Sequence, residues 1–178
     1  HRRLDPGQGS EGAGMVGPNM ATTIGVFTTD AAISKPLLQN ALSVAIGQSL
    51  NRLTVDGHQS TNDTAVILAS GQAGNKPIVK QADDCRKFTS ALTALCTDLA
   101  KQMALDAEGA TRMFTVQIQG AVTQADALKA ARAVADYDLV KCAIHGGDTN
   151  WGRIICAVGS CGIKLNPDKL TCTIGGIT

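Results

Sequence analysis

A short stretch in which a loop becomes a strand constrains this chain more than any other part of its sequence. Residues 12–20 read Gly-Ala-Gly-Met-Val-Gly-Pro-Asn-Met, which is typical of a loop, because glycine keeps backbone freedom and proline donates no backbone hydrogen bond. The residues after Thr23 read Ile-Gly-Val-Phe-Thr-Thr, and their side chains favour a buried strand. The small Gly25 indicates that another group packs closely against this strand. Thr22 therefore lies where a loop meets a strand.

Thr22 would become a nucleophile if the peptide bond before it were cut. A threonine hydroxyl without an adjacent base reacts poorly at neutral pH, but an N-terminal threonine carries an α-amine with an ordinary pKa of about 7.7–8.0 that can act as its base. In such a cut the Thr22 hydroxyl attacks the Ala21 carbonyl, the acyl group moves from nitrogen to oxygen, and water completes the cleavage. The small Ala21 leaves room for this attack. Taken alone, these residues favour the plainer interpretation, a threonine-rich strand start.

Composition excludes several other classes of function. The 178 residues suffice for one domain, or for one domain and part of another, and the hydrophobic content of 44% is typical of a globular protein. A net charge of +1 gives no reason to expect nucleic acid or a membrane surface as a partner. No apolar run reaches the ~18–20 residues of a membrane span, and the N-terminus lacks the apolar segment of a signal peptide.

The six cysteines are expected to be free, structural thiols. No Cys-x-x-Cys pair occurs, and the nearest spacing, Cys156-x4-Cys161, is not typical of a zinc site. Four lie among apolar neighbours, where a free cysteine behaves as a small hydrophobe: Cys85, Cys96, Cys142 and Cys156. Reduced thiols point to a cytoplasmic location, or to the interior of an organelle in a eukaryote.

Apolar spacing predicts several helices and one half-buried strand. Intervals of three and four residues indicate helices, whereas strict alternation indicates a strand with one exposed face. The predicted helices run from Lys35 to near Leu50, from a cap at Asp83 to the break at 106–111, from Thr123 to about Asp136, and from a cap at Asn150 to Gly159; the predicted strand covers 111–119. The apolar segment 139–144 fits either a helix or a strand.

A polar loop follows the first predicted helix. Asp56-Gly57 marks a turn, and residues 60–64, Ser-Thr-Asn-Asp-Thr, place hydroxyls, an amide and a carboxylate in one short segment. Such a segment usually satisfies its own backbone. The alternative is that it borders a reaction site and orients the nucleophile.

Two of these stretches resemble segments of the ornithine acetyltransferase family, the bifunctional glutamate N-acetyltransferases. Residues 12–22 and 28–31 resemble the family's self-cleavage segment, Lys-Gly-Ser/Ala-Gly-Met-Ile-x-Pro-Asn-Met-Ala-Thr before a strand that ends in Thr-Thr-Asp-Ala. Residues 51–64 resemble its Asn-x-Ile-Thr-Val-Asp-Gly-Asp-Thr-Ser-Thr-Asn-Asp-Thr, with His58 in place of an aspartate. No role is assigned to His58, but the match strengthens the interpretation of residues 60–64 as the border of a reaction site.

Two later motifs extend the resemblance. Residues 108–111 read Glu-Gly-Ala-Thr, as in the family, and residues 146–154 resemble its Gly-x-Asp-Pro-Asn-Trp-Gly-Arg-Ile, with Thr149 where proline is usual. The resemblance therefore runs from about Gly12 to the C-terminus through four motifs in the family's order. Residues 1–10 have no part in it.

The resemblance implies roles for individual residues. Thr22 is the catalytic nucleophile and a substrate-binding residue after cleavage between Ala21 and Thr22. Glu108 contacts the substrate's amino group, although a carboxylate just beyond a helix C-terminus can also simply be solvated. Arg153 is a ligand for a substrate carboxylate or a member of a buried ion pair, and we keep it out of the catalytic set.

Glu11 departs from the family pattern at a substrate-binding position. The family has a lysine there that binds the substrate's α-carboxylate, and like charges across an interface cost several kcal/mol. Three interpretations remain: the substrate differs, Arg2 or Arg3 substitutes for the lysine, or the region is not native sequence.

The resemblance implies an α/β fold, a layered α/β sandwich of the self-processing threonine-nucleophile type with a second, smaller α/β subdomain. We expect residues 1–21 to form the arm and loop before the cleavage site, residues 22–110 the nucleophile-bearing part of the sandwich, and residues 111–178 a truncated C-terminal subdomain. It also implies a partial chain, because family members have a preceding segment and a further C-terminal stretch.

The activity implied is ping-pong acetyl transfer in arginine biosynthesis. The Thr22 hydroxyl takes the acetyl group from N-acetylornithine and passes it to glutamate, with acetyl-CoA as a co-substrate of bifunctional members and no metal or other cofactor. The implied partners are these small substrates and the upstream chain of the same precursor, and the two cleaved halves form a heterotetramer. Because the family's oxyanion-stabilising Thr-Gly pair lies upstream, we expect these 178 residues alone to be inactive.

Two rival functions remain open. An N-terminal-nucleophile aminopeptidase or amidase shares the self-cleavage but passes the acyl group to water. An inert, unprocessed fragment would stay whole, whereas processing would leave a piece of 157 residues (178 minus 21) that begins at Thr22.

Overall fold

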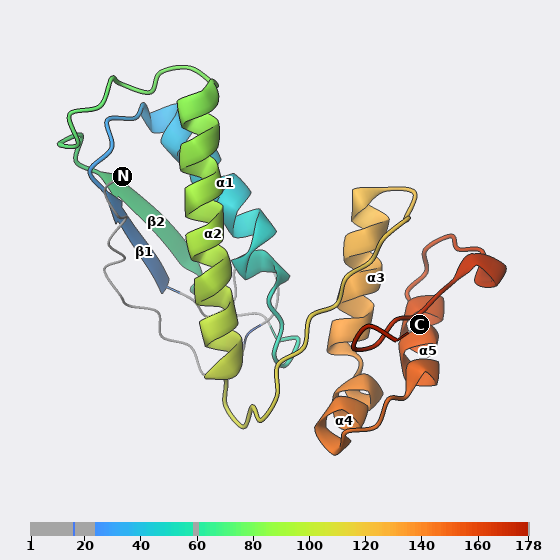
Figure 1. The fold of residues 1–178 in the computed structure, drawn as a ribbon. Coiled ribbons are helices and arrows are strands. Elements are labelled where there is room, and N and C mark those ends of the chain that lie inside the picture. The colour runs from blue at the N-terminus through green and yellow to red at the C-terminus, as the bar shows by residue number, and fades with distance from the viewer. Residues whose placement is uncertain (1–15, 17–23, 59–60, 178) are drawn as a thin grey trace. The chain divides into compact units, whose positions relative to one another are not determined.

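The computed structural model describes residue 16, residues 24–58 and residues 61–177 of the chain. The chain folds into two compact units, His1–Gly109 and Ala110–Thr178 (Figure 1). Within the described residues, no helix is both long enough and apolar enough to cross a membrane. Except for Val16, the predicted arm and loop at residues 1–21 lie outside the described residues.

The first unit contains two parallel strands. β1 (Ile24–Thr29) and β2 (Thr64–Ala69) pair in register from Ile24 beside Thr64 to Thr29 beside Ala69. The strand predicted after Thr23 is confirmed. Parallel strands need a crossover connection, and here that connection contains a helix, α1 (Lys35–Gln48).

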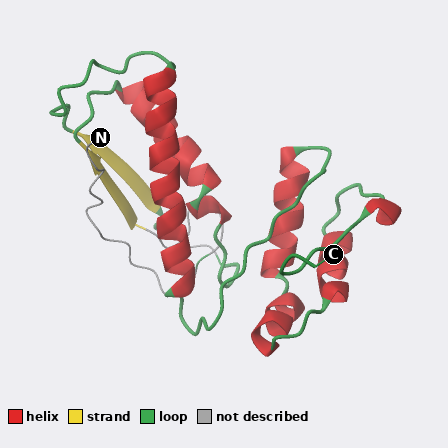
Figure 2. Ribbon diagram, in the orientation of Figure 1, coloured by secondary structure: helices red, strands yellow, loops and turns green. Residues whose placement is uncertain are grey.

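Only one face of β1 is buried, which corrects the expectation of a wholly buried strand. Gly25, Phe27 and Thr29 alternate inward, whereas Ile24 and Val26 are 58% and 47% exposed. The reason is that both helices of the unit cover the same face of the sheet (Figure 2). The close approach predicted at Gly25 comes from within the strand, since a Cβ there would lie 3.2 Å from the ring of Phe27.

The helices α1 and α2 (Asp83–Leu105) pack together over this face. Their apolar stripes follow the predicted three- and four-residue spacing and enclose the side chain of Phe27 from β1. The buried cluster consists of Phe27, Ala41, Leu42, Ala45, Ile46, Leu92 and Cys96. A short 3-10 helix, η1 (Leu50–Arg52), follows α1.

The ends of α2 test two predictions. The cap predicted at Asp83 is wrong, because Ala82 occupies the cap position and Asp83 is the first helical residue. There its carboxylate faces the positive end of the helix dipole and pairs with Arg86. The predicted break is confirmed, since α2 ends at Leu105 and Gly109 adopts a positive φ of 69°.

The second unit packs three helices around a smaller core. These are α3 (Gln124–Asp136), α4 (Asp138–Gly146) and α5 (Trp151–Ser160), and a short 3-10 helix, η2 (Pro167–Lys169), follows them. The helices predicted after Thr123 and Asn150 are confirmed, and the ambiguous segment 139–144 is helical. The core residues are Ala130, Val134, Val140, Ala157 and Val158.

The alternating segment 111–119 is extended, but the prediction of a strand is wrong. Phe114, Val116 and Ile118 are half-buried against the core of this unit, as the alternation requires. A strand also needs a hydrogen-bonded neighbour, and within the described residues this segment has none.

All six cysteines are free thiols. Cys85 and Cys96 are buried, as expected of small hydrophobes, whereas Cys142 and Cys156 are exposed, so that expectation is wrong for these two. Both lie on short helices, where a few apolar neighbours in the sequence do not determine which side of the helix faces the core. Burial raises the pKa of the Cys96 thiol to about 11 despite a hydrogen bond from Ser49, so this thiol stays protonated at neutral pH.

Replacement of Leu92 by alanine tests the core of the first unit. Leu92 is 2% exposed, so the Leu92→Ala variant should lower the free energy of unfolding by about 3 kcal/mol through lost burial and a residual cavity. The matched control is Leu105→Ala on the same helix, where the side chain is 60% exposed and a change below about 1 kcal/mol is expected. Urea titration of both variants measures the difference, and equal losses would contradict the packing described.

Candidate active site

Val16, the residue before β1 that the structure describes, is hydrogen-bonded to a loop about forty positions later in the chain. The backbone N–H of Val16 donates to Asp56 Oδ1 at 3.0 Å, and the N–H of Val55 donates to the Val16 carbonyl oxygen at 2.8 Å. Val16 itself is 3% exposed. The chain six residues before Thr22 is therefore attached to the turn at residues 55–57.

Asp56 forms this turn with its own side chain. Its Oδ1 also accepts the backbone N–H of His58 at 2.9 Å, and Gly57 adopts a positive φ of 73°. This is the aspartate–glycine turn that the sequence predicts. The His58 Nδ1 lies 3.6 Å from the same oxygen, with its ring 74% exposed.

Two hydrogen bonds of the polar loop before β2 lie within the loop itself. The Thr61 hydroxyl donates to Asn62 Oδ1 at 3.2 Å, and the Thr64 hydroxyl reaches the Asn62 carbonyl oxygen at 3.5 Å. These contacts fit the interpretation that the loop satisfies its own groups. The strand register adds a second fact, because Thr64 at the end of this loop lies beside Ile24 at the start of β1.

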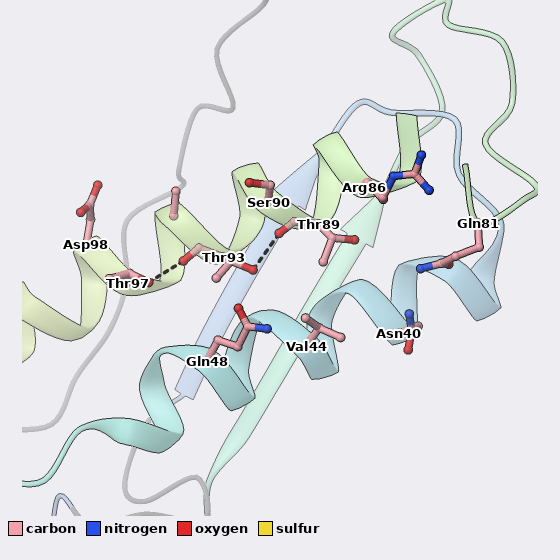
Figure 3. Close-up of a pocket in the computed structure, with 11 residues that line it drawn as sticks. Asn40, Val44, Gln48, Gln81, Arg86, Thr89, Ser90, Thr93, Thr97 and Asp98 are labelled. Carbon is pink, nitrogen blue, oxygen red and sulfur yellow. Dashed lines mark hydrogen bonds between the residues drawn. The ribbon is translucent and has the colours of Figure 1, made fainter. Parts of the chain in front are cut away.

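Both helices of the unit end where both strands begin. In Figure 3 the strands point toward the end of the helix pair that carries Arg86, near the start of α2. The bridge between Ile33 and Ile78 agrees, since it joins the exit of β1 to the approach to α2. The C-terminal end of α2 therefore lies at the same end of the unit as Ile24.

Glu108 follows that end of α2. It stands three residues beyond Leu105, between the buried Ala107 and the turn at Gly109, and is exposed. Its carboxylate makes no hydrogen bond or ion pair with the described residues, so it is open to solvent or to a cationic ligand. The predicted residues Glu11, Ala21 and Thr22 lie outside the described residues, and so does Ser60.

Arg153 makes no ion pair with the described residues, and its predicted role as a ligand for a substrate carboxylate stays a prediction. It is half-buried at the start of α5, and its guanidinium Nη1 donates to the carbonyl oxygen of Leu139 at 2.8 Å. Its backbone N–H donates to the cap side chain of Asn150 at 3.3 Å. Arg153 thus links α5 to α4 through a main-chain acceptor rather than through an ion pair.

Thr111, the last residue of the Glu-Gly-Ala-Thr motif, has a partner that the sequence does not indicate. Its hydroxyl lies 3.0 Å from His145 Nδ1, which ties the start of the second unit to α4. Spacing alone does not reveal this contact, because the two residues stand 34 positions apart.

A polar groove of about 600 Å³ lies between α1 and α2, and the strands pass behind it in Figure 3. Three threonines line it, but each hydroxyl donates to the carbonyl oxygen four residues earlier: Thr89, Thr93 and Thr97, at 2.8–2.9 Å. None of the described residues predicted for the active site lines this groove. Among the described residues, no three histidine, cysteine or acidic side chains are placed to hold a metal ion.

Known proteins resemble the chain over nearly its whole length. A sequence model of the ArgJ family matches residues 7–178. The "arginine biosynthesis bifunctional protein ArgJ" of Shouchella clausii is 48% identical over 93% of this chain, and that of Geobacillus stearothermophilus is 46% identical over 95%. The chain spans only 41% of the length of either relative.

A solved structure agrees with these relatives. The crystal structure of the arginine biosynthesis bifunctional protein from Bacillus halodurans superposes with a TM-score of 0.77 at 46% identity, over 80% of this chain and 67% of that one. This likeness confirms the predicted α/β fold class. The family match confirms the resemblance read from the four motifs, and the chain belongs to the ArgJ family.

Proposed function

We propose that the full-length protein transfers an acetyl group from N-acetylornithine to glutamate, with acetyl-CoA as a second donor. The observation that carries this proposal is the family match over residues 7–178, in which the motif around Thr22 is retained. The relatives carry names that place them in arginine biosynthesis. No metal or further cofactor takes part in the proposed reaction.

The reaction begins with self-cleavage. The Thr22 Oγ attacks the carbonyl carbon of Ala21, the bond from that carbon to the Thr22 nitrogen breaks, and the nitrogen takes the proton. Water then hydrolyses the ester, which leaves a carboxylate on Ala21 and returns a hydroxyl to Thr22. The product is a threonine whose own α-amine stands beside its Oγ.

Two acyl transfers follow. The Thr22 Oγ attacks the acetyl carbon of N-acetylornithine while the α-amine takes its proton, and the bond to the ornithine nitrogen breaks as that nitrogen is protonated. The α-amine of glutamate then attacks the acetyl ester, and the Thr22 oxygen leaves and regains its proton. Each step exchanges one acyl bond for another, so no redox partner is needed.

The geometry of the first unit supports this assignment. Thr22 is two residues from Ile24, so the chain length alone keeps their α-carbons within about 7 Å of each other. Ile24 lies beside Thr64 and at the same end of the unit as the C-terminus of α2. The exposed carboxylate of Glu108 follows that end and suits the ammonium group of ornithine. We propose two cleaved halves of one precursor as the active assembly.

Substitution of Thr22 tests the nucleophile. Thr22→Ala should leave the full-length protein uncut, because no hydroxyl remains to attack Ala21, whereas Thr22→Ser should still cleave. Intact-mass measurement and N-terminal sequencing identify the products. In the cleaved protein, incubation with N-acetylornithine should add one acetyl group to Thr22, and added glutamate should remove it as N-acetylglutamate. Release of acetate alone would favour the amidase, and cleavage of Thr22→Ala would refute the mechanism.

Glu11→Lys tests the departure from the family pattern. Lysine would replace like-charge repulsion by attraction toward the substrate's α-carboxylate, so KM for N-acetylornithine should fall by about tenfold with little change in kcat. Glu11→Gln removes only the repulsion and should have a smaller effect. Steady-state kinetics of the cleaved enzyme measure both, and an unchanged KM in the lysine variant would count against a carboxylate-binding role at this position.

Glu108→Gln tests the proposed ammonium contact. Loss of a charged hydrogen-bond acceptor should lower kcat/KM for N-acetylornithine by about 10- to 100-fold. The matched control is Asp106→Asn, which removes an exposed carboxylate two residues earlier and should change kcat/KM by less than about twofold. Similar losses in both variants would indicate a general electrostatic effect instead of a specific contact.

A further inference from the structure

The Asp56 carboxylate supplies a partner that the buried Val16 amide requires. Val16 is 3% exposed, and a buried N–H without an acceptor costs free energy comparable to a lost hydrogen bond. Asp56 Oδ1 accepts that N–H at 3.0 Å, and the neighbouring Val55 N–H donates to the Val16 carbonyl oxygen at 2.8 Å. Two bonds on one residue fix the direction of the chain as well as its position.

The attachment of Val16 lies a short, fixed number of residues before the proposed cleavage site. Five residues, 17–21, separate Val16 from Thr22, and β1 begins two residues after Thr22. The described residues on either side of the Ala21–Thr22 bond are both attached, Val16 to the Asp56 turn and Ile24 beside Thr64. Holding both ends restricts the orientations of the bond between them, and orientation governs intramolecular attack.

We infer that Asp56 is a positioning residue for self-cleavage. This inference rests on the proposed function. Asp56 takes no proton and touches no reacting atom; it acts through Val16, whose attachment limits the approach of the Thr22 hydroxyl to the Ala21 carbonyl. The turn formed by Asp56 with His58 holds the carboxylate in place for this contact.

Three variants of the full-length protein test the hydrogen bond. Asp56→Ala removes the acceptor and should lengthen the half-time of cleavage at least tenfold, whereas Asp56→Asn keeps an Oδ1 and should stay within about threefold of the parent. Asp84→Ala removes an exposed carboxylate elsewhere in the same unit and should cleave at the parental rate. Cell-free translation followed by intact-mass measurement over time gives each half-time. Equal slowing by alanine and asparagine, or none by alanine, overturns the inference.

A glycine inserted between Val16 and Gly17 separates positioning from general destabilisation. The insertion leaves Asp56 intact but lengthens the held segment, so it should slow cleavage by itself. In the Asp56→Ala background it should add less than about twofold, because the upstream end is already released. If the insertion slows cleavage by the same factor with and without Asp56, so that the two fold-changes multiply in the double variant, the inference is overturned. The fully cleaved Asp56→Ala protein should melt somewhat below the parent, because the buried Val16 N–H has lost its acceptor, but it should still unfold cooperatively, which separates slow cleavage from a failure to fold.

The parent and Thr22→Ala arms keep the two proposals distinguishable. Failure of the parent to cleave, or cleavage of Thr22→Ala, refutes the proposed function itself. Cleavage of the parent together with an unaffected Asp56→Ala variant refutes only the role of Asp56.

Discussion

The parallel pairing of β1 with β2 is the constraint on which the first unit depends. A parallel pair cannot be joined by a tight turn, so the chain must cross back along the length of the sheet, and α1 does so. The crossover brings the starts of both strands to one end of the unit. The polar loop at residues 61–64 and the residues that follow α2 therefore lie at the same end of the unit as Ile24, the first residue of β1, although they are far apart in sequence.

The sequence alone predicts β1 and both helices of this unit, the helices because they have long apolar stripes, but it does not identify β2 as a strand. Leu92, Cys96 and Met103 recur along α2 and are all buried. The prediction fails where a short apolar pattern does not show which element the segment packs against or pairs with. Cys142 and Cys156 lie on helices of nine and ten residues, and the alternation at 111–119 describes an exposed and a buried side without naming a neighbouring strand.

The candidate site is predictable in its chemistry but not in its connections. The choice of Thr22 follows from the loop-to-strand change and the family motif, and Glu108 follows from a second motif. Nothing local, however, links Val16 to Asp56, because a backbone amide carries no sequence signature. Arg153 illustrates the same limit, since the sequence does not reveal that its guanidinium donates to the carbonyl oxygen of Leu139, 14 positions earlier.

Phe27 has a consequence that reaches beyond the core it fills. Its ring lies against the helices because β1 has one register with β2, and a slip by a single residue would turn that ring into water and move Ile24 by about 3.3 Å along the sheet. Reactive groups need placement within about 0.5 Å. An aromatic ring that takes no part in the proposed chemistry therefore sets the position of the strand that begins two residues after the proposed nucleophile, Thr22.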